Sequence, residues 1–451
     1  MTRDTTRRAA LGVRRIVAIA LIVTAAVALP RAAQGPEPVS YWSGIAKTVI
    51  VDMANRGGSP SAIDFAYVHA AIYDAVNAID QRYTVFAVSP TTFPDGASEP
   101  AAVAAAAATI LKALFPAQQG FVGAQYDAYV GLIPDGDRKT RGIAVGTEVA
   151  NAFLAQRKPG PRQDLGQDGR NATCATDVRL CYTFGAGPGV YQLTPGANPD
   201  PNVTPAAQWV GILKPFAVES QSQFRADGPP NLTSAQWADD YNETKTFGAA
   251  NGPATQEQKN IGWFYTDNPG AYGNRILRQI AADQNLALAD SARFFAQSYV
   301  TLADTFINCW DSKRFYNFWR PVTAIRAGDT DGNDATEPDP SWLPLALTPN
   351  HQEYPSAHGC FTGAVINAVE DFFGTKKITL HFTSCSVPGY SCTPPGVGVT
   401  HTFQRTQDAL KEVIEGRIYG GMHYRTSVVH GIVVSNKVAH WISKHYFLPV
   451  D

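Results

Sequence analysis

The chain has 451 residues, enough to bury a large core as one big domain or two modest ones. Hydrophobic residues make up 45% of it and charged residues 17%, which is typical of a globular protein and excludes a disordered one. The net charge of −2 gives no reason to expect nucleic acid or an acidic membrane surface as a partner, so any basic site must be local.

The N-terminal segment, residues 1–33, has the pattern of a secretory signal peptide. Arginines precede an apolar stretch at 16–29, and small residues follow it. This stretch is short for a membrane span, so an uncleaved anchor is the less favoured alternative. "TRRAAL" hints at twin-arginine export. We therefore expect an exported protein, periplasmic or secreted, with no membrane segment in its mature form.

Helical patterns dominate the rest of the chain, and strand patterns are sparse. Apolar residues recur with the period of a helix. The predicted helices are 64–79, 101–114, 286–319, 356–373, 405–419 and 423–445. A Gly/Pro/Asn-rich stretch without periodicity covers 158–215, and long loops of this kind tend to be functional covers or segments that wrap the surface. The sequence therefore predicts a mainly α protein with one long loop.

The six cysteines fit an exported protein. Two pairs are close in sequence within loops that contain Gly and Pro, and we expect each to form a local disulfide. These pairs are Cys174 with Cys181 and Cys385 with Cys392. Of the two remaining cysteines, Cys309 and Cys360, a third disulfide is favoured over two inert buried thiols.

The first candidate site segment is "KRFYNFWRP", residues 313–321. Lys313 and Arg320 are seven residues apart, so they are predicted to share one face of a helix that Pro321 ends. Two cations on an aromatic-rich helix need an anion or a carboxylate to meet them. Taken alone, the segment fits two separate surface salt bridges as well.

The second segment is "EYPSAHGC", residues 353–360. Pro355 suits the start of a helix, whose free N–H groups attract an oxyanion. Ser356 adds a hydroxyl donor, and His358 can move a proton. His358 heads an apolar stripe with Phe361 and is therefore predicted to point inward. The plainer alternative is a capping serine followed by a core histidine.

The third segment is "EGRIYGGMHYR", residues 415–425. Arg417 lies on an inward apolar stripe, and a buried arginine demands a carboxylate or a bound anion. Gly420 and Gly421 break the helix, which lets His423 converge with Arg417. A helix that simply ends at Gly-Gly beside an incidental histidine is the alternative. Together the three segments supply three cations and two histidines, a set suited to a tetrahedral or trigonal-bipyramidal oxyanion.

Lys-x6-Arg-Pro, Pro-Ser-x-His and Arg-x3-Gly-x-His, in this order, resemble the signature of vanadium-dependent haloperoxidases and phosphatidic-acid-phosphatase-type phosphatases. "FWRP", "YPSAHG" and "GRIYGGMHYR" are most similar to the bacterial exported haloperoxidase branch. The likeness covers roughly 290–440. It implies two four-helix bundles packed around an anion site, within a single helical domain, 34–451, whose active-site half is 290–445.

The resemblance also implies residue roles and a cofactor, vanadate, which phosphate can replace. His423 would bond vanadium through Nε2. Lys313, Arg320 and Arg417 would neutralise the oxygens, and Ser356 and the backbone N–H of Ala357 would hydrogen-bond them. His358 would handle protons while hydrogen peroxide binds, and Lys313 would polarise the peroxide. A halide would then be oxidised to hypohalous acid, which halogenates a small organic nucleophile.

Two positions depart from the family pattern. Ala357 stands where glycine is usual, and an added methyl need not block an amide donor. Ser427 stands where many members carry aspartate, which leaves open whether a hydroxyl or a backbone carbonyl orients His423. Asp304 or Asp311 is a candidate partner for one of the site cations.

Two further residues bear on the choice of halide. His351 matches a position that is aromatic in chlorinating and histidine in brominating relatives, and Trp310 matches a tryptophan lining the site. The resemblance therefore favours bromide and iodide, and a histidine that only hydrogen-bonds solvent is the alternative for His351.

Two other functions use the same residues. An exported acid phosphatase would use His423 as nucleophile and His358 as general acid. An anion-binding protein would hold phosphate without turnover. The sequence identifies neither the organic substrate nor the oligomeric state, and a homo-oligomer is compatible with it.

Overall fold

The computed structural model describes residues 37–157, 182, 185–194, 205–392 and 397–450. Pro36–Asp451 is one compact unit. The predicted signal peptide, the predicted pair Cys174–Cys181 and most of the long loop's first half lie outside the described residues. The α-helices are α1 Pro38–Lys47, α2 Gly58–Asp80, α3 Glu99–Leu114, α4 Gln119–Val130, α5 Asp137–Arg157, α6 Ala235–Phe247, α7 Gln256–Phe264, α8 Pro269–Asp283, α9 Leu288–Tyr316, α10 Pro321–Arg326, α11 Ala357–Phe373, α12 Thr406–Tyr419 and α13 Arg425–His445.

Shorter elements complete the described part of the chain. They are a π-helical turn Thr48–Met53, the 3₁₀ turns Pro116–Gln118, Gln208–Ile212 and Gly328–Thr330, and the strands β1 Leu380–Ser384 and β2 Val399–Phe403. The two strands form one antiparallel hairpin in which Leu380 faces Phe403. The mainly α class predicted from the sequence is confirmed.

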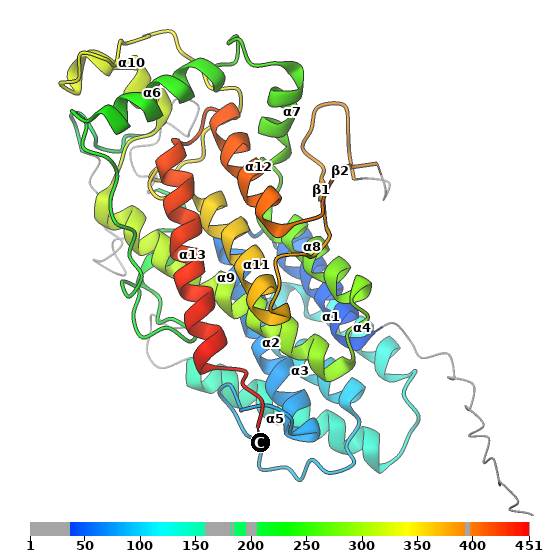
Figure 1. The fold of residues 1–451 in the computed structure, drawn as a ribbon. Coiled ribbons are helices and arrows are strands. Elements are labelled where there is room, and N and C mark those ends of the chain that lie inside the picture. The colour runs from blue at the N-terminus through cyan, green and yellow to red at the C-terminus, as the bar shows by residue number, and fades with distance from the viewer. Residues whose placement is uncertain (1–36, 158–181, 183–184, 195–204, 393–396, 451) are drawn as a thin grey trace, which may run out of the picture. The chain divides into compact units, whose positions relative to one another are not determined.

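Two groups of packed helices make up the core (Figure 1). In the first group, α2 packs against α3 and α5, and the alanine-rich α3 is buried along nearly its whole length. In the second group, α11 packs against α9, α12 and α13. The long helices α2 and α9 lie against each other and join the groups through one continuous apolar core.

The N-terminus of α11 crosses α13 at very short range. A Cβ added to Gly359 would lie 2.4 Å from the carbonyl oxygen of Val428, and one added to Gly431 would lie 2.8 Å from that of Ser356. Neither position therefore has room for a side chain. The backbone N–H of Ser356 also donates to the carbonyl of Ser427 at 3.0 Å. This crossing fixes the start of α11 against the start of α13.

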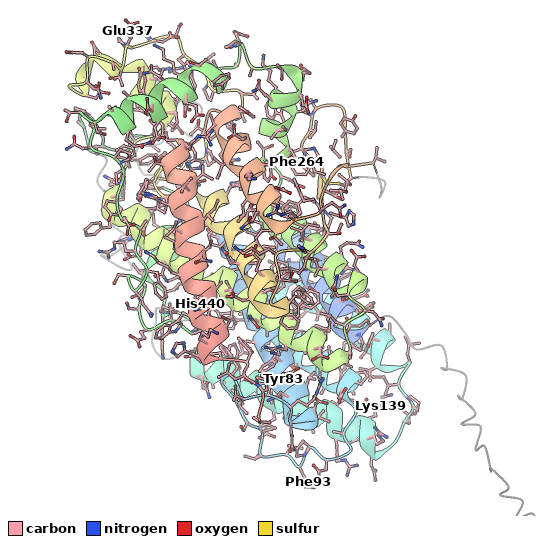
Figure 2. The ribbon with its side chains drawn as sticks, in the orientation of Figure 1. Tyr83, Phe93, Lys139, Phe264, Glu337 and His440 are labelled. Carbon is pink, nitrogen blue, oxygen red and sulfur yellow. A yellow bond between two sulfur atoms is a disulfide. The ribbon has the colours of Figure 1, made fainter. Side chains whose placement is uncertain are left out.

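An aromatic contact attaches the hairpin to the helices, and a disulfide lies within the loop that connects its two strands. Phe264 lies at the end of α7 (Figure 2). Its ring stacks on His401 of β2 with centroids 4.0 Å apart. Cys385 and Cys392, just after β1, form the predicted disulfide.

Replacing Cys385 and Cys392 with serine is expected to lower the free energy of unfolding by about 2 kcal/mol, because the disulfide closes a short loop and restricts the unfolded chain. Chemical denaturation of the wild-type and double-serine proteins measures this difference. An unchanged midpoint under oxidising conditions would contradict the prediction.

Two predictions about the core are wrong. The helix predicted at 286–319 ends at Tyr316, because Asn317 takes a left-handed conformation with φ 49°. Pro321 therefore begins α10 instead of ending α9, and Arg320 is the N-cap residue of α10. Cys309 and Cys360 are free buried thiols and not a disulfide.

Within the described ranges, none of the helices has the length and apolar character needed to cross a bilayer.

Candidate active site

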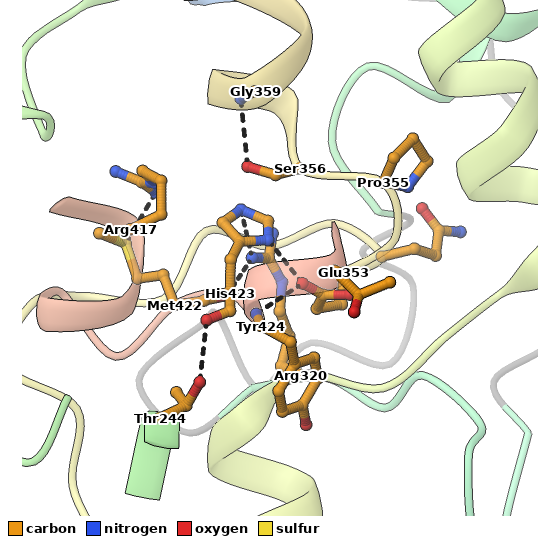
Figure 3. Close-up of polar contacts among 12 residues, drawn as sticks. Thr244, Arg320, Glu353, Pro355, Ser356, Gly359, Arg417, Met422, His423 and Tyr424 are labelled. Carbon is orange, nitrogen blue, oxygen red and sulfur yellow. Dashed lines mark hydrogen bonds and ion pairs between the residues drawn. The ribbon is translucent and has the colours of Figure 1, made fainter. Parts of the chain in front are cut away.

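His423 lies in the turn between α12 and α13. Helix α12 ends at Tyr419, and Gly421 has φ +70°, a backbone conformation that suits glycine. This turn brings His423 back toward the last turn of α12, which carries Arg417. Figure 3 shows the His423 ring at the centre, with Arg417 and Met422 on one side and Glu353 on the other. The glycine bend predicted from the sequence is confirmed.

The hydrogen bonds of His423 define its tautomer. Nε2 contacts Nη1 of Arg320 at 3.1 Å, and Nδ1 contacts Oε1 of Glu353 at 2.7 Å. Because a guanidinium can only donate, Nε2 must accept, and the proton must be on Nδ1, where Glu353 accepts it. Burial, with Arg320 next in effect, holds the pKa of His423 well below its usual range. The ring is thus neutral, with a lone pair on Nε2 that faces the cations.

Glu353 is the functional residue that the sequence prediction missed. It is fully buried and stands two residues before Pro355. Burial raises the pKa of Glu353 to about 7, an effect that the charges of Arg320 and Lys313 partly offset. Its place within "EYPSAHGC" was the available signal. Glu353 therefore provides the partner of His423 that the sequence left open at Ser427.

Lys313 and Arg320 reach the site from opposite ends of the α9–α10 junction. The ammonium of Lys313 donates to the backbone carbonyls of Gln352 and Glu353 at 2.8 and 2.9 Å, which leaves a third N–H for another acceptor. Burial lowers the pKa of Lys313 to about 8 and that of Arg320 to about 10. Arg320 also donates to the carbonyls of His351 and Met422. Backbone carbonyls thus hold both cations in place without neutralising them.

Arg417 is buried at the end of α12, as its place on the apolar stripe predicts. Nη1 donates to the carbonyl of Tyr265 at 2.5 Å, and Nη2 donates to the sulfur of Met422 at 3.2 Å. Its Nε has no hydrogen-bond partner among the described residues. Burial, followed by the charge of Arg320, lowers the pKa of Arg417 to about 9, so it stays cationic at neutral pH. A buried N–H without a partner is a free donor for an anion.

The start of α11 supplies the remaining donors. Ser356 is the N-cap residue, and its hydroxyl oxygen accepts from the N–H of Gly359 at 3.3 Å. Its own O–H and the N–H of Ala357, the first helical residue, are available to an oxyanion. Nε2 of His358 has no partner among the described residues, and burial, then Arg417, holds its pKa well below the usual range. The capping alternative and the anion-binding hypothesis are therefore compatible.

His351 and Trp310 lie together beside Arg320. Their ring centroids are 5.3 Å apart, and Nδ1 of His351 is 3.0 Å from Nη2 of Arg320. Two described residues of the long loop, Tyr191 and Ala206, lie next to His351 and Trp310. Trp310 donates to the carbonyl of Ala206 at 3.2 Å, and Tyr191 donates to Asn350, the neighbour of His351, at 2.7 Å.

Contacts join the cations of the three segments. Lys313 and His423 both contact Glu353, Arg320 contacts His423, and Arg417 contacts Met422, the neighbour of His423. The pKa of His358 is lowered, after burial, by Arg417, Arg320 and Lys313. The two aspartates considered as partners of these cations lie elsewhere. Asp304 accepts from three successive backbone N–H groups at 216–218, and Asp311 pairs with Arg225 at 2.6 Å. The cluster has three cations but one buried carboxylate, so an oxyanion with two or more charges fits it.

The amino-acid sequence is similar to those of known proteins. Residues 293–450 match the model of the VCPO second helical-bundle domain. Vanadium chloroperoxidase of Curvularia inaequalis is 27% identical over an alignment of 387 positions that covers 70% of this chain. The match spans 61% of the length of that protein.

Solved structures share the fold. A bacterial vanadium-dependent iodoperoxidase superposes with a TM-score of 0.72 at 21% identity, over 92% of this chain and 98% of that one. The holo-type structure of a bacterial vanadium-dependent chloroperoxidase superposes with a TM-score of 0.63 at 16% identity, over 90% and 95% of the two chains. The resemblance and the helical-bundle fold predicted from the three motifs are confirmed.

Proposed function

Because this chain resembles the vanadium-dependent haloperoxidases in its second helical bundle and in its fold, we propose that it oxidises halides with hydrogen peroxide to hypohalous acid. The cofactor is vanadate, held by Lys313, Arg320, Ser356, Ala357, Arg417 and His423. The proposal is carried by one observation: a buried histidine whose Nε2 accepts from Arg320 and whose pKa is lowered by burial and then by the charges of Arg320, Arg417 and Lys313.

The donor set fits vanadate. An imidazole lone pair is a suitable ligand for a Lewis-acidic centre, and Glu353, by accepting the Nδ1 proton, increases the basicity of that lone pair. Arg320 now donates to Nε2, so this contact is exchanged for one to an oxygen when an oxyanion binds. The unpartnered N–H of Arg417 and the third N–H of Lys313 are further donors.

In the reaction, each residue acts from the position that the fold gives it. Vanadate, when bound, supplies a Lewis acid that activates peroxide without changing its own oxidation state. Nε2 of His358, which has no partner and whose pKa is lowered by burial, is free to accept a proton from hydrogen peroxide as it binds. Lys313, held by two carbonyls, has one N–H left to donate, and this positive charge would withdraw electron density from an oxygen bound at the site.

The test is bromination of a phenolic dye by purified protein with vanadate, peroxide and bromide. We expect activity that depends on vanadate at acidic to neutral pH. A rate equal to that of the vanadate-free control throughout this range would refute the proposal.

An exported acid phosphatase is the second candidate, and the contact between Glu353 and His423 favours it. A nucleophilic histidine benefits from a carboxylate partner, and Glu353 provides one at 2.7 Å. In this reaction His423 would form a phosphohistidine and His358 would protonate the leaving group. Phosphomonoester hydrolysis by metal-free protein, inhibited by vanadate, would support this function over halide oxidation.

We further propose that bromide and iodide are the preferred halides, because His351 occupies the position next to Arg320 and Trp310. His351→Phe is expected to raise the ratio of kcat/KM for chloride to that for bromide about tenfold, roughly 1.4 kcal/mol. The reason is that the Nη2 group of Arg320 loses its imidazole acceptor and would be free to donate to an oxygen bound at the site.

The measurement is a series of initial rates with chloride, bromide and iodide. His440→Phe on the exposed face of α13 is the matched control (Figure 2). If His351→Phe left the chloride-to-bromide ratio of kcat/KM unchanged, His351 would have no part in halide selectivity.

The remaining proposals concern the context of the enzyme. Export by the signal peptide at 1–33 would place the single helical domain, 34–451, outside the cytoplasm, where a local disulfide such as Cys385–Cys392 is stable. The described parts of the 158–215 loop contact Trp310 and Asn350, which supports its role as a cover over the pocket for a small organic nucleophile.

A further inference from the structure

Of the two methionines in the described residues, Met422 is the one that lies inside the cation cluster. It stands between Gly421 and His423, and 2% of its surface is exposed. Its sulfur accepts from Nη2 of Arg417 at 3.2 Å, and its carbonyl oxygen accepts from Nη1 of Arg320 at 2.9 Å. Figure 3 shows the Met422 side chain directed at Arg417, beside the His423 ring. The thioether of Met422 therefore contacts a guanidinium that is proposed to bind the anion.

The thioether sulfur of Met422 is a weak hydrogen-bond acceptor for Arg417, and oxidation of this sulfur would make it a stronger one. A thioether sulfur accepts hydrogen bonds poorly, whereas a sulfoxide oxygen is polar and accepts them well. The methyl end of Met422 packs against Gly420, where an added Cβ would lie 2.7 Å from Cε. The methyl group is thus held on the backbone side while the sulfur contacts the guanidinium.

We propose that Met422 is a self-oxidation site: oxidant formed at the anion cluster converts its thioether to a sulfoxide, whose oxygen then competes with the anion for Arg417. This inference rests on the proposed haloperoxidase function, which supplies hypohalous acid as the oxidant. As a consequence, the affinity of the site for its anion would fall as the number of turnovers rises.

The chemistry balances with hypobromous acid as the oxidant. The sulfur lone pair attacks bromine, the Br–O bond breaks and hydroxide leaves. Water then adds its oxygen to the sulfur while bromide and two protons leave. The net reaction oxidises sulfur by two electrons, reduces the bromine to bromide and releases one proton.

The chain contains its own reference for this reaction. It has three methionines, and Met53, in the π-helical turn, is 46% exposed. Oxidant arriving from bulk solvent reaches Met53 before Met422, because the latter is buried. Oxidant released at the cluster meets Met422 first. The order in which the two residues are oxidised therefore reports where the oxidant was formed.

The experiment follows both residues by peptide mass spectrometry during turnover with vanadate, peroxide and bromide. Excess free methionine in solution intercepts released hypobromite. We expect Met422 sulfoxide to form at least about tenfold faster than Met53 sulfoxide, and reagent hypobromite without turnover to reverse this order. Bromination of the dye in a parallel run without the scavenger, with Met422 left intact in both runs, would overturn the inference alone. No bromination in the absence of the scavenger would overturn the proposed function, and the inference with it.

Two further readouts test the consequence. Orthophosphate affinity, measured by calorimetry, should fall about tenfold in protein oxidised by turnover and recover after treatment with a methionine sulfoxide reductase. Met422→Leu should hold its own initial rate for more turnovers than wild type, whereas the matched variant Met53→Leu should lose activity as wild type does. Equal rates of loss in all three proteins would overturn the inference.

Discussion

Replacing His423 with alanine is expected to reduce halide oxidation by a factor on the order of 10³ or more, because the substitution removes the lone pair that would bond the cofactor. The other donors remain, since Lys313, Arg320 and Arg417 are each held by backbone carbonyls and not by His423 alone. The variant should therefore still bind orthophosphate, with reduced affinity.

Initial rates of dye bromination and calorimetric titration with orthophosphate measure the two effects separately. His440→Ala, on the exposed face of α13, is the control for loss of an imidazole. If His423→Ala kept more than about a tenth of the wild-type rate, a bond between Nε2 and the cofactor would be ruled out as the basis of catalysis. Loss of phosphate binding together with unfolding would instead assign His423 a structural role.

Replacing Glu353 has the second-largest expected effect. Glu353→Gln keeps an oxygen near Nδ1 of His423 but removes the charge, and we expect vanadate affinity to fall about 10- to 100-fold, as is typical when the partner of a ligating histidine is changed. Glu353→Ala also leaves the buried Nδ1–H of His423 and the cations Arg320 and Lys313 without a carboxylate, which is expected to destabilise the fold by about 3–5 kcal/mol.

The two variants separate positioning from stability. Glu353→Gln should lose vanadate affinity while its unfolding midpoint stays close to that of wild type, whereas Glu353→Ala should lose both. Glu412→Gln is the matched control, because Glu412 makes the same kind of contact with Nδ1 of His401, at 2.7 Å, outside the site. A Glu353→Gln protein with wild-type vanadate affinity would show that the carboxylate does not tune His423.

The sequence identifies segments that lie together in the fold, but it does not give the contacts between them. Residue types and short spacings identified the three segments, because a buried arginine, a helix start and a glycine bend each have a local signature. The contact between Glu353 and His423 joins residues 70 positions apart. No local spacing encodes such a contact, so the sequence alone does not identify Glu353 as the partner of His423.

The wrong predictions have similar physical causes. Lys313 and Arg320 were expected on one helix, but Asn317 accepts a left-handed conformation and ends α9 between them. Cys309 and Cys360 are suited to a disulfide by residue type. Whether two thiols on different helices have the geometry for a bond depends on how α9 and α11 pack, which the period of the apolar residues does not define.

The crossing of α11 and α13 has a consequence for how such an enzyme can change. Two glycine hydrogens, at Gly359 and Gly431, set the span between the first turn of α11 and the turn that carries His423. That span is a property of the main chain and is insensitive to most side-chain replacements nearby. Under the proposed function, substitutions at His351 or Met422 would change reactivity, while the distance between the starts of α11 and α13 would stay constant.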